Sequence, residues 1–360
     1  MRVRPREVAM DLGTSNTLVR IRGRGLVFAA PSVVAVDDAD GALLAVGADA
    51  HRMLGRAPDR VRVIEPLHEG VIFDAEAAGA LVRHALACHG MAGRIRPDVV
   101  VCAPAGITAV ERRALEQAVA SAGARCTVVM EEPLAGAIGA GLPVSDAGAG
   151  VVADIGGGTT EVVVLSLGGI VVRESVRIGG RHMDEAIAAH LARARRLAVG
   201  PSSAEALKLA VGSAGGGSGA AEVGGRDLDT GLPRMVRVDA EEIAAALAEP
   251  VEEIVAAIGR TLERTPADLA GDVLDRGVTL IGGGSCLHGL DALVMARLGV
   301  PVHRPDDPLG CVARGAELAL SEMATLRRSS GARTVRRRHV RLARARPPTA
   351  WRAASRHTRN

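Results

Sequence analysis

The most informative stretch of this sequence is Asp154-Ile-Gly-Gly-Gly-Thr-Thr160. It follows the apolar run Val151–Asp154 and leads into Glu161–Leu167, and both flanking runs are typical of strands. Three successive glycines lose much conformational freedom on folding, so their presence needs a reason. Backbone N–H groups that close around a phosphate supply that reason, whereas a tight hairpin turn would need fewer glycines. The stretch is therefore interpreted as a phosphate-binding loop.

A similar unit lies 143 residues earlier, at Asp11-Leu-Gly-Thr-Ser-Asn-Thr17. It also separates two strand-like runs, Glu7–Asp11 and Leu18–Arg22. Gly13 allows the backbone to approach an anion, and the polar residues of the turn offer side-chain donors. Alone, this unit is more simply a hairpin with a polar turn. Two such units half a chain apart predict a duplicated domain with a cleft between the halves.

A third glycine cluster, Gly282-Gly-Gly-Ser285, follows the strand-like Thr279–Ile281 and precedes a helix-like segment. A helix N-terminus with glycines accepts a phosphate or lets a purine lie against the backbone. None of the three clusters is a GxxxxGK[ST] loop, and the single lysine, Lys208, lies elsewhere. Asp11 and Asp154 end their strands as carboxylates suited to a hydrated Mg²⁺. These features together predict a nucleotide in the cleft.

The remaining sequence is typical of an α/β fold, in which short β-branched runs alternate with longer segments rich in Ala, Leu, Glu and Arg. The stretch Gly212–Gly225 is rich in Gly, Ala and Ser and predicts a flexible surface loop. Further strands are expected at Val33–Val36, Asp98–Cys102 and Ile170–Arg177, and helices at Ala109–Ala122, Met183–Leu197 and Glu241–Arg264.

Composition limits the classes of function that fit. A length of 360 residues predicts two domains, and 48% apolar with 24% charged residues is typical of a soluble globular protein. Aromatic residues make up only 1%, so stacking on nucleic-acid bases is nearly unavailable. Residues 327–360 contain twelve Arg and no acidic residue; without them acidic residues outnumber basic ones, which argues against nucleic-acid binding. Five scattered cysteines without a CxxC pair fit reduced thiols in a cytosol and no structural zinc.

The motifs resemble those of a known superfamily. Asp11–Thr17 and Asp154–Thr160 resemble the two phosphate loops of the actin, sugar-kinase and heat-shock ATPase superfamily, and Gly282–Ser285 resembles its adenosine motif. A closer resemblance, to the bacterial actin homologues of the MreB/Mbl family, runs in order from about Glu7 to Leu326. It rests on Ala30–Val36, Met53–Arg56, Val110–Ala114, Glu131–Ser145, Asp154–Val162, Ser175–Gly180 and Asp307–Gly315.

The resemblance implies a role for each candidate site residue. Asp11 and Asp154 would position Mg²⁺ through its waters, and Glu132 would orient the attacking water, which is what phosphoryl transfer needs. Glu205 and Lys208 would contact ribose and adenine; without the resemblance they are more simply a surface ion pair. The residues implied to hold the phosphates are Gly13, Thr14, Ser15, Asn16, Gly156, Gly157, Gly158 and Thr159, and those implied for adenosine are Gly282, Gly283, Gly284 and Ser285.

The implied architecture is an actin-like α/β fold with two RNase-H-like domains around a nucleotide cleft. Domain I would span residues 1–142, completed by about 306–326, and domain II residues 143–305 with a small upper subdomain at about 180–240. Residues 327–360 are interpreted as a disordered Arg-rich tail, inert in the first instance.

The implied function is that of a cytoplasmic cytoskeletal protein that forms filaments with ATP and Mg²⁺ and hydrolyses ATP slowly to ADP. It would direct cell-wall synthesis, and hence cell shape or spore-wall formation, together with membrane-bound elongation or sporulation machinery. Peripheral contact with the inner face of the cell membrane, through Met91 or the Arg tail, is a weaker expectation, and nucleic acid is not an expected partner.

Two alternatives stay open. One is a degenerate family member that binds nucleotide without polymerising, which the Gly-rich stretch Gly212–Gly225 favours. The other is a small-molecule kinase of the same superfamily. Two departures from the family pattern bear on the site. His51 stands where a lysine is usual and is interpreted as exposed and inert, and Leu209 with Ala210 replaces a polar pair beside the adenine position.

Overall fold

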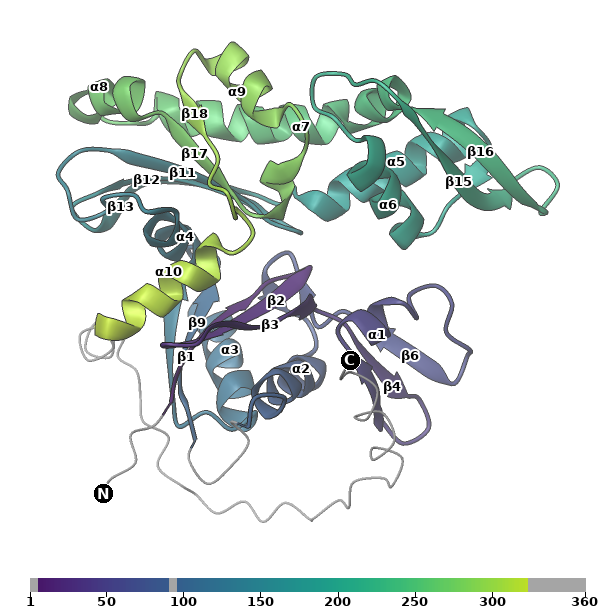
Figure 1. Ribbon diagram of the computed structural model, residues 1–360, viewed down its shortest axis with the longest axis horizontal. Coiled ribbons are helices and arrows are strands. Elements are labelled where there is room, and N and C mark those ends of the chain that lie inside the picture. The colour runs from purple at the N-terminus through teal and green to yellow at the C-terminus, as the bar shows by residue number, and fades with distance from the viewer. Residues whose placement is uncertain (1–5, 91–95, 323–360) are drawn as a thin grey trace.

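The computed structural model describes residues 6–90 and 96–322, which form two lobes, one above the other (Figure 1). We call residues 6–131 the lower lobe and residues 150–303 the upper lobe, and each is centred on a five-stranded sheet. Within the described residues no helix is long and apolar enough to cross a membrane. The Arg tail 327–360 and Met91, both considered above for membrane contact, lie outside the described residues.

The lower sheet carries the first phosphate-loop candidate. Its order is β10 (Cys126–Glu131), β9 (Asp98–Ala103), β1 (Glu7–Leu12), β2 (Asn16–Ile21) and β3 (Gly25–Pro31). The three strands β1, β9 and β10 are parallel, and β2 and β3 follow antiparallel. All six residues of β9 are buried, as its continuous apolar sequence predicts. The carboxyl ends of β1 and β10 therefore bring Asp11 and Glu131 to the same edge.

Helices α2 (Ala75–Ala87) and α3 (Ala109–Ser121) pack against each other and bury their apolar faces in the lower-lobe core. Each begins at a side-chain cap. The Asp74 carboxylate accepts from the N–H groups of Glu76 and Ala77, and Thr108 and Glu111 form a capping box. The beginning of α3 was predicted correctly, and α3 fixes one end of the loop that follows β9.

The upper sheet repeats the arrangement around the second candidate loop. Its order is β13 (Gly169–Val176), β12 (Thr160–Ser166), β11 (Gly150–Ile155), β17 (Val278–Ile281) and β18 (Val302–His303). The hairpins β1–β2 and β11–β12 share one register, in which Asp11 is opposite Leu18 and Asp154 opposite Glu161. Helix α7 (Ala240–Glu263) packs on this sheet with α8 (Ala267–Arg276) and α9 (Leu290–Leu298) around one core. The predicted α/β fold with repeated units is confirmed.

A smaller sheet extends the upper lobe, in the order β14 (Leu197–Ala198), β15 (Ala220–Asp227) and β16 (Pro233–Asp239). Helices α5 (Gly180–Ala194) and α6 (Pro201–Val211) pack on it. The prediction of a flexible loop over Gly212–Gly225 is wrong for Ala220–Gly225, which belong to β15. A side chain at Gly225 would overlap Leu197 and Ala198 of β14, so glycine here serves close strand packing.

In the lower lobe the corresponding extension is a second sheet, in the order β5 (Leu43–Val46), β4 (Val34–Asp37) and β6 (Val61–Ile64), with α1 (Ala48–His51) beside it. The short strands β7 (Leu67–His68) and β8 (Val71–Ile72) then lead the chain back toward the first phosphate-loop candidate. Figure 1 shows this small sheet below α6, on the other side of the space between the lobes.

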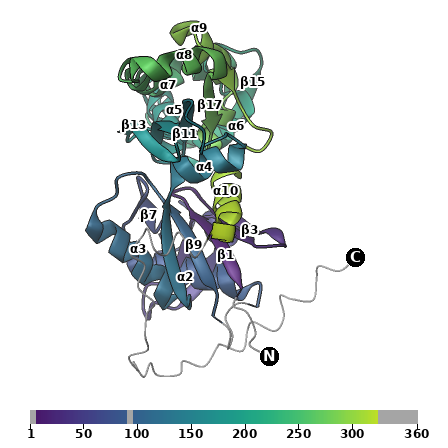
Figure 2. The same ribbon diagram turned by 90° about the vertical axis from the view of Figure 1, so that its left-hand side faces the viewer.

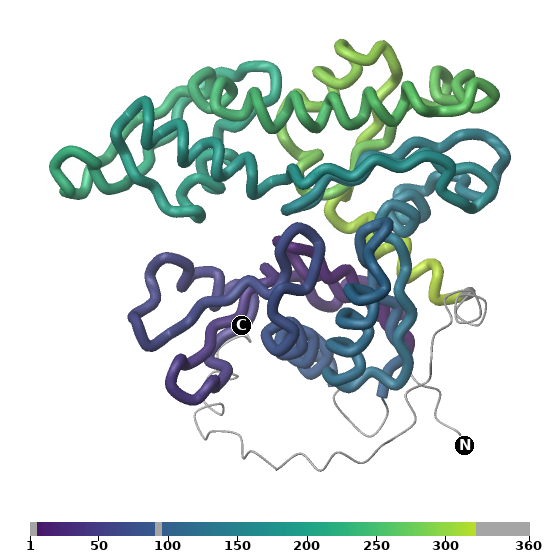
Figure 3. The backbone as a smooth tube through the Cα atoms, turned by 180° about the vertical axis from the view of Figure 1, so that it is seen from behind, coloured from purple at the N-terminus to yellow at the C-terminus, as the bar shows by residue number. Residues whose placement is uncertain are grey.

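The lobes are joined by two helices, α4 (Glu132–Ala140) and α10 (Cys311–Ala319). Figure 2 shows them stacked between the lobes, and Figure 3 shows the same junction from behind. A Cβ at Gly139 would overlap the Cys311 carbonyl, and one at Gly315 would overlap the Ala135 carbonyl. The helices are therefore in backbone contact. Helix α10 also packs on β1, β2 and β9, so it ties the junction to the lower sheet.

Candidate functional site

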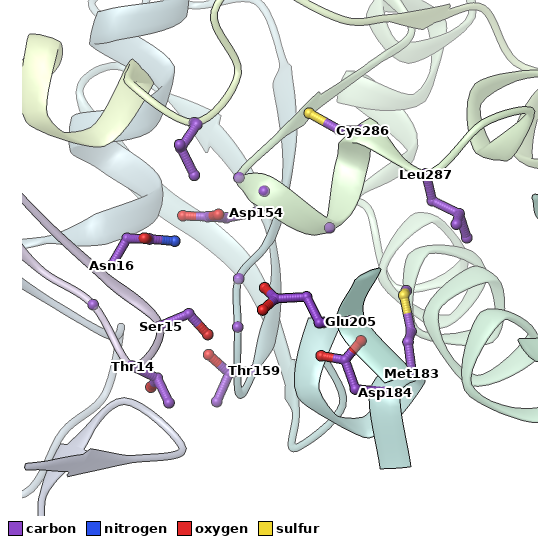
Figure 4. Close-up of a pocket in the computed structure, with 18 of the residues that line it drawn as sticks. Thr14, Ser15, Asn16, Asp154, Thr159, Met183, Asp184, Glu205, Cys286 and Leu287 are labelled. Atoms are coloured by element: carbon purple, nitrogen blue, oxygen red, sulfur yellow. The ribbon is translucent and has the colours of Figure 1, made fainter. Parts of the chain in front are cut away.

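A cavity of about 480 Å³ lies between the lobes, and most of the predicted site residues line it. Those residues are Asp11, Gly13, Thr14, Ser15, Asn16, Glu132, Asp154, Gly156, Gly157, Thr159, Glu205, Lys208, Gly282, Gly283 and Gly284. Figure 4 shows Thr14, Ser15 and Asn16 on one side, with Asp154 and Thr159 facing them. Of the predicted set, Gly158 and Ser285 do not line the cavity. Its volume falls within the range of small-molecule sites.

The first loop is held by bonds within its own lobe. Gly13 N donates to Asn16 O (3.1 Å), which closes the turn between β1 and β2. The Ser32 hydroxyl donates to Gly13 O (2.6 Å), and Ser32 N donates to Ser15 O (2.9 Å). The buried Thr14 hydroxyl accepts from Gly70 N (2.8 Å). This loop is thus rigid and offers polar side chains to the cavity.

The second loop approaches the first closely. Gly156 N donates to Thr159 O (2.8 Å), which closes the turn between β11 and β12. A side chain at Gly157 would overlap the Ser15 hydroxyl of the first loop. A Cβ at Gly158 would lie 3.0 Å from Glu69 Cα, so Gly158 packs on the lower lobe and not on the cavity. The three-glycine run therefore lets the two lobes meet, in addition to leaving room for an anion.

Three carboxylates converge at the inner end of the cavity. Burial raises the pKa of Asp154 to about 7, and burial together with the Asp154 charge raises the pKa of Asp11 to about 8. Withdrawal from water, with the charge of Asp11 nearby, also raises the pKa of Glu132 well above its usual range. Among the described residues no group of three or more Asp, Glu, His or Cys side chains could hold a metal ion directly, but carboxylate oxygens are the donors that Mg²⁺ prefers, and this ion usually keeps several waters. Asp11 and Asp154 fit a hydrated Mg²⁺.

Sequence reasoning missed a fourth acid, Glu161, which is only 3% exposed in β12. Both of its carboxylate oxygens accept from Ala105 N at 3.0 Å, and burial raises its pKa to about 8. Ala105 belongs to the lower lobe, so this contact crosses between the lobes. The available signal was a single charged residue inside the apolar run of β12.

The far end of the cavity carries the predicted α6 residues. Lys208 Nζ donates to Gly180 O (2.8 Å) and lies 2.8 Å from the Asp184 carboxylate. The alternative of a surface pair between Glu205 and Lys208 is therefore wrong, because Lys208 pairs with Asp184 and its side chain is only 13% exposed. Asp184 was not predicted. Burial raises its pKa to about 6 although Lys208 opposes the shift.

Several apolar or weakly polar side chains complete this end, and sequence reasoning did not identify them. They are Met183, Cys286, Leu287 and His288, and they lie with Leu209, which was expected beside the adenine position. Leu209 is 77% exposed and stands at the edge of the cavity. Figure 4 shows Met183 and Leu287 at the same end as Asp184. An apolar end opposite a polar, glycine-rich end suits a molecule with a flat ring at one end and phosphates at the other.

The third glycine cluster differs from its prediction. Gly283–Cys286 form a single 3₁₀ turn, and α9 does not begin until Leu290, so the cluster is not an α-helix N-terminus. Gly282 has φ 80°, and a Cβ there would overlap Ile155 O, which explains why glycine is needed. The buried Ser285 hydroxyl donates to Gly282 O (2.7 Å). Ser285 therefore closes the turn, and Gly282–Gly284 form the wall of the cavity.

Ion pairs also connect the lobes. Glu65 pairs with Arg181, and Arg177 Nη1 lies 3.1 Å from the Glu69 carboxylate. His51 Nε2 lies 3.8 Å from the Glu205 carboxylate, so the interpretation of His51 as exposed needs correction. Its side chain is half-buried, and it faces an acid of the other lobe.

Comparison with known proteins shows which family this chain resembles. Residues 5–328 match the family model described as MreB/Mbl protein. The chain is 45% identical over 322 residues to the cell shape-determining protein MreB of Escherichia coli, covering 87% of this chain and 93% of that protein. It is 40% identical over 324 residues to the cell shape-determining protein Mbl of Bacillus subtilis, covering 89% and 97%.

Two solved structures share the fold. MreB 5 of Spiroplasma citri bound to AMPPNP superposes with a TM-score of 0.86 at 31% identity, covering 91% of this chain and 99% of that one. A MamK double helical filament gives a TM-score of 0.75 at 26% identity, covering 89% and 99%. Because both the family model and these relatives span nearly the whole chain, the chain belongs to the MreB/Mbl family of actin-like proteins.

Proposed function

We propose that this chain binds ATP with Mg²⁺ in the cavity between its lobes and assembles into filaments that direct cell-wall synthesis. The observation that carries the proposal is the contact of two glycine-bearing loops, one from each lobe, above converging carboxylates. A ligand that touches both loops favours one angle between the lobes. Nucleotide state is thereby coupled to the surfaces that the lobes present to other subunits.

The phosphates are held by the two loops. Gly13, Ser15 and Asn16 reach them from the lower lobe and Gly156, Gly157 and Thr159 from the upper lobe. Asp11 and Asp154 hold Mg²⁺ through its waters, and the bound ion neutralises charge on the phosphates. The ring system lies toward Gly282–Gly284 and α6, where Glu205 remains free of Lys208 for a sugar hydroxyl.

Glu132 is the residue that we assign to hydrolysis. It begins α4, lines the cavity and lies near Asp11 and Asp154. A carboxylate in this place orients a water for attack on the terminal phosphate. Hydrolysis is expected to be slow, because in the proposed function the reaction determines how long each subunit of the filament keeps its ATP.

The relatives support assembly. MreB 5 has been solved with AMPPNP and with ADP, and MamK as a double helical filament. We place the protein in the cytoplasm, where it works with membrane-bound elongation or sporulation machinery. We assign domain I to residues 1–142 completed by about 306–326, and domain II to 143–305 with its upper subdomain at about 180–240.

The test is sedimentation of the purified full chain with Mg-ATP, Mg-ADP or EDTA, followed by electron microscopy of the pellets. Ordered filaments that depend on nucleotide are expected. A protein that binds Mg-ATP by calorimetry but stays soluble at several micromolar contradicts the assembly step. Coupled release of ADP on addition of a sugar or an acid would instead identify a kinase. Of the Gly-rich stretch that favours a non-polymerising protein, Ala220–Gly225 form a paired strand, whereas Gly215–Gly219 lie outside any helix or strand.

A further inference from the structure

Glu161 makes a buried contact between the lobes that the proposed function leaves unexplained. It lies opposite Asp154 in the β11–β12 hairpin, and both its oxygens accept from Ala105 N at 3.0 Å. Ala105 is in the loop between β9 and α3, so an upper-lobe side chain holds a lower-lobe backbone group. Because a carboxylate is expensive to bury, its presence here requires a reason.

The equivalent position in the first hairpin shows that strand packing is not the reason. Leu18 stands opposite Asp11 as Glu161 stands opposite Asp154, and Leu18 is buried without any charge. An apolar side chain therefore satisfies this position in the hairpin. Glu161 also meets Ser175 of β13 within its own lobe, but its contact with Ala105 N is the one that reaches the other lobe.

The loop that Glu161 holds is connected to the first phosphate loop. A side chain at Gly70 would overlap Pro104, so the 104–106 loop packs directly on Gly70. Gly70 N in turn donates to the Thr14 hydroxyl (2.8 Å). A continuous series of contacts thus runs from β12, immediately after the second phosphate loop, to Thr14 in the first.

The same loop also contacts the surroundings of Glu132. Ala103, at its start, pairs with Glu131, the residue before Glu132. On its other side, a Cβ at Gly106 would lie 2.9 Å from the Arg173 guanidinium carbon of β13. The loop is therefore fixed between the upper sheet and the strand end that leads to Glu132.

We propose that Glu161 is a positioning residue for phosphoryl transfer: it holds the 104–106 loop against the upper lobe and so sets Thr14 and Glu132 relative to the second phosphate loop. This inference rests on the proposed ATP hydrolysis. Nucleotide binding depends on many residues that line the cavity, whereas the rate of hydrolysis depends on how Glu132 is aligned with the terminal phosphate. Loss of Glu161 therefore lowers the hydrolysis rate much more than the affinity.

The experiment uses the full chain with Glu161→Leu, which removes both acceptor oxygens, and Glu161→Gln, which keeps one. Asp272→Asn is the matched control, since Asp272 accepts from Ala149 N (2.9 Å) within the upper lobe. Three quantities are measured: Mg-ATP affinity by calorimetry, single-turnover hydrolysis, and hydrogen exchange of the 103–108 segment.

Glu161→Leu is expected to slow single-turnover hydrolysis roughly 10-fold or more, with affinity within about 3-fold of wild type and faster exchange at 103–108. Glu161→Gln should recover part of the rate, and Asp272→Asn should leave rate and exchange unchanged. Wild-type hydrolysis in both Glu161 variants overturns the proposal. So does a parallel loss of affinity, rate and melting temperature, because that pattern marks a purely structural role.

Failure of the proposed function has a different signature. A wild-type chain that does not bind Mg-ATP, or binds it without hydrolysis, contradicts that function irrespective of Glu161. Hydrogen exchange then decides on Glu161 alone. Unchanged exchange at 103–108 in Glu161→Leu shows that the side chain does not hold the loop, and overturns the inference.

Discussion

The two phosphate loops occupy equivalent turns of equivalent hairpins but are built from different materials. The first has one glycine and a row of polar side chains, and bonds from Ser32 and Gly70 tie it to its own lobe. The second has three glycines and contributes few side chains. The difference shows that hydrogen bonds hold the first loop in place, whereas the second loop has no side chains at its glycines, so that the first loop can approach its backbone.

The largest expected effect comes from changing Glu132, the residue that we propose for hydrolysis. Glu132→Gln should lower single-turnover ATP hydrolysis by roughly 100-fold or more, because it loses the carboxylate that orients the water. Affinity for Mg-ATP and nucleotide-dependent pelleting should persist, since both loops remain. Loss of binding along with hydrolysis would show that Glu132 holds the loops together and does not act on water.

Next is the contact between the loops. Gly157→Ala should weaken Mg-ATP binding by about 10-fold or more, since an overlap with Ser15 separates the lobes by even a small distance. Ser15→Gly alone should have a smaller effect. The double variant should recover part of the affinity, because the overlapping hydroxyl is gone. Calorimetry measures all three, and additive losses would refute a direct contact between the loops.

A smaller effect is expected for Asp11 and Asp154, the carboxylates that precede the two loops. The pKa of Asp154 is raised from 3.8 to about 7, so the folded chain binds more protons than the unfolded chain between these values. This group's contribution to stability is present at low pH and is lost as pH rises toward 7 and above. Without nucleotide, Asp154→Asn should therefore melt at least about 3 °C higher than wild type at pH 8, equivalent to about 1 kcal/mol.

The same variant should differ from wild type much less near pH 4, where the Asp154 carboxyl is protonated in the folded chain and about half protonated in the unfolded chain. Melting curves in EDTA from pH 4 to pH 8 measure this difference. Asp11→Asn should behave similarly, since the pKa of Asp11 is raised to about 8. An Asp154→Asn protein that is less stable at pH 8 would mean that the carboxylate has a favourable partner in the folded chain.

The smallest effect is expected where the lobes meet away from the loops. Arg177 is 79% exposed in its pair with Glu69, and exposed pairs contribute at most about 1 kcal/mol. Arg177→Ala should change Mg-ATP affinity by less than about 3-fold, and the change should shrink in high salt. A larger effect that persists in high salt would mean that the ion pairs at the edge of the cavity contribute more to Mg-ATP affinity than the contact between the loops.

The sequence allowed correct prediction of the features that depend on local pattern. The two Asp-strand-turn units and α3, with its Thr108 cap, follow from periodicity and capping chemistry. Features that depend on packing could not be predicted in this way. Ala220–Gly225 has the composition of a loop, yet it is a strand because it pairs with β16 along its whole length, and Gly225 leaves room for β14.

The candidate site shows the same limit. Lys208 was placed correctly at the cavity, but its partner Asp184 lies 24 positions earlier in another helix, where no local pattern links them. Ser285 and Gly158 carry the right residue types for ligand contact, but their partners are Gly282 and Glu69. The partner of Glu161, a backbone N–H, leaves no trace in the sequence at all.

Helices α4 and α10 touch through their backbones at Gly139 and Gly315, without side chains that could yield between them. Glu132 is the first residue of α4, so a change in the crossing of the two helices would move the helix that carries Glu132. A neighbour in a filament that twisted one lobe against the other would thus alter the timing of hydrolysis in this subunit. The fraction of subunits in a filament whose ATP has been hydrolysed would then depend on the mechanical load on that filament.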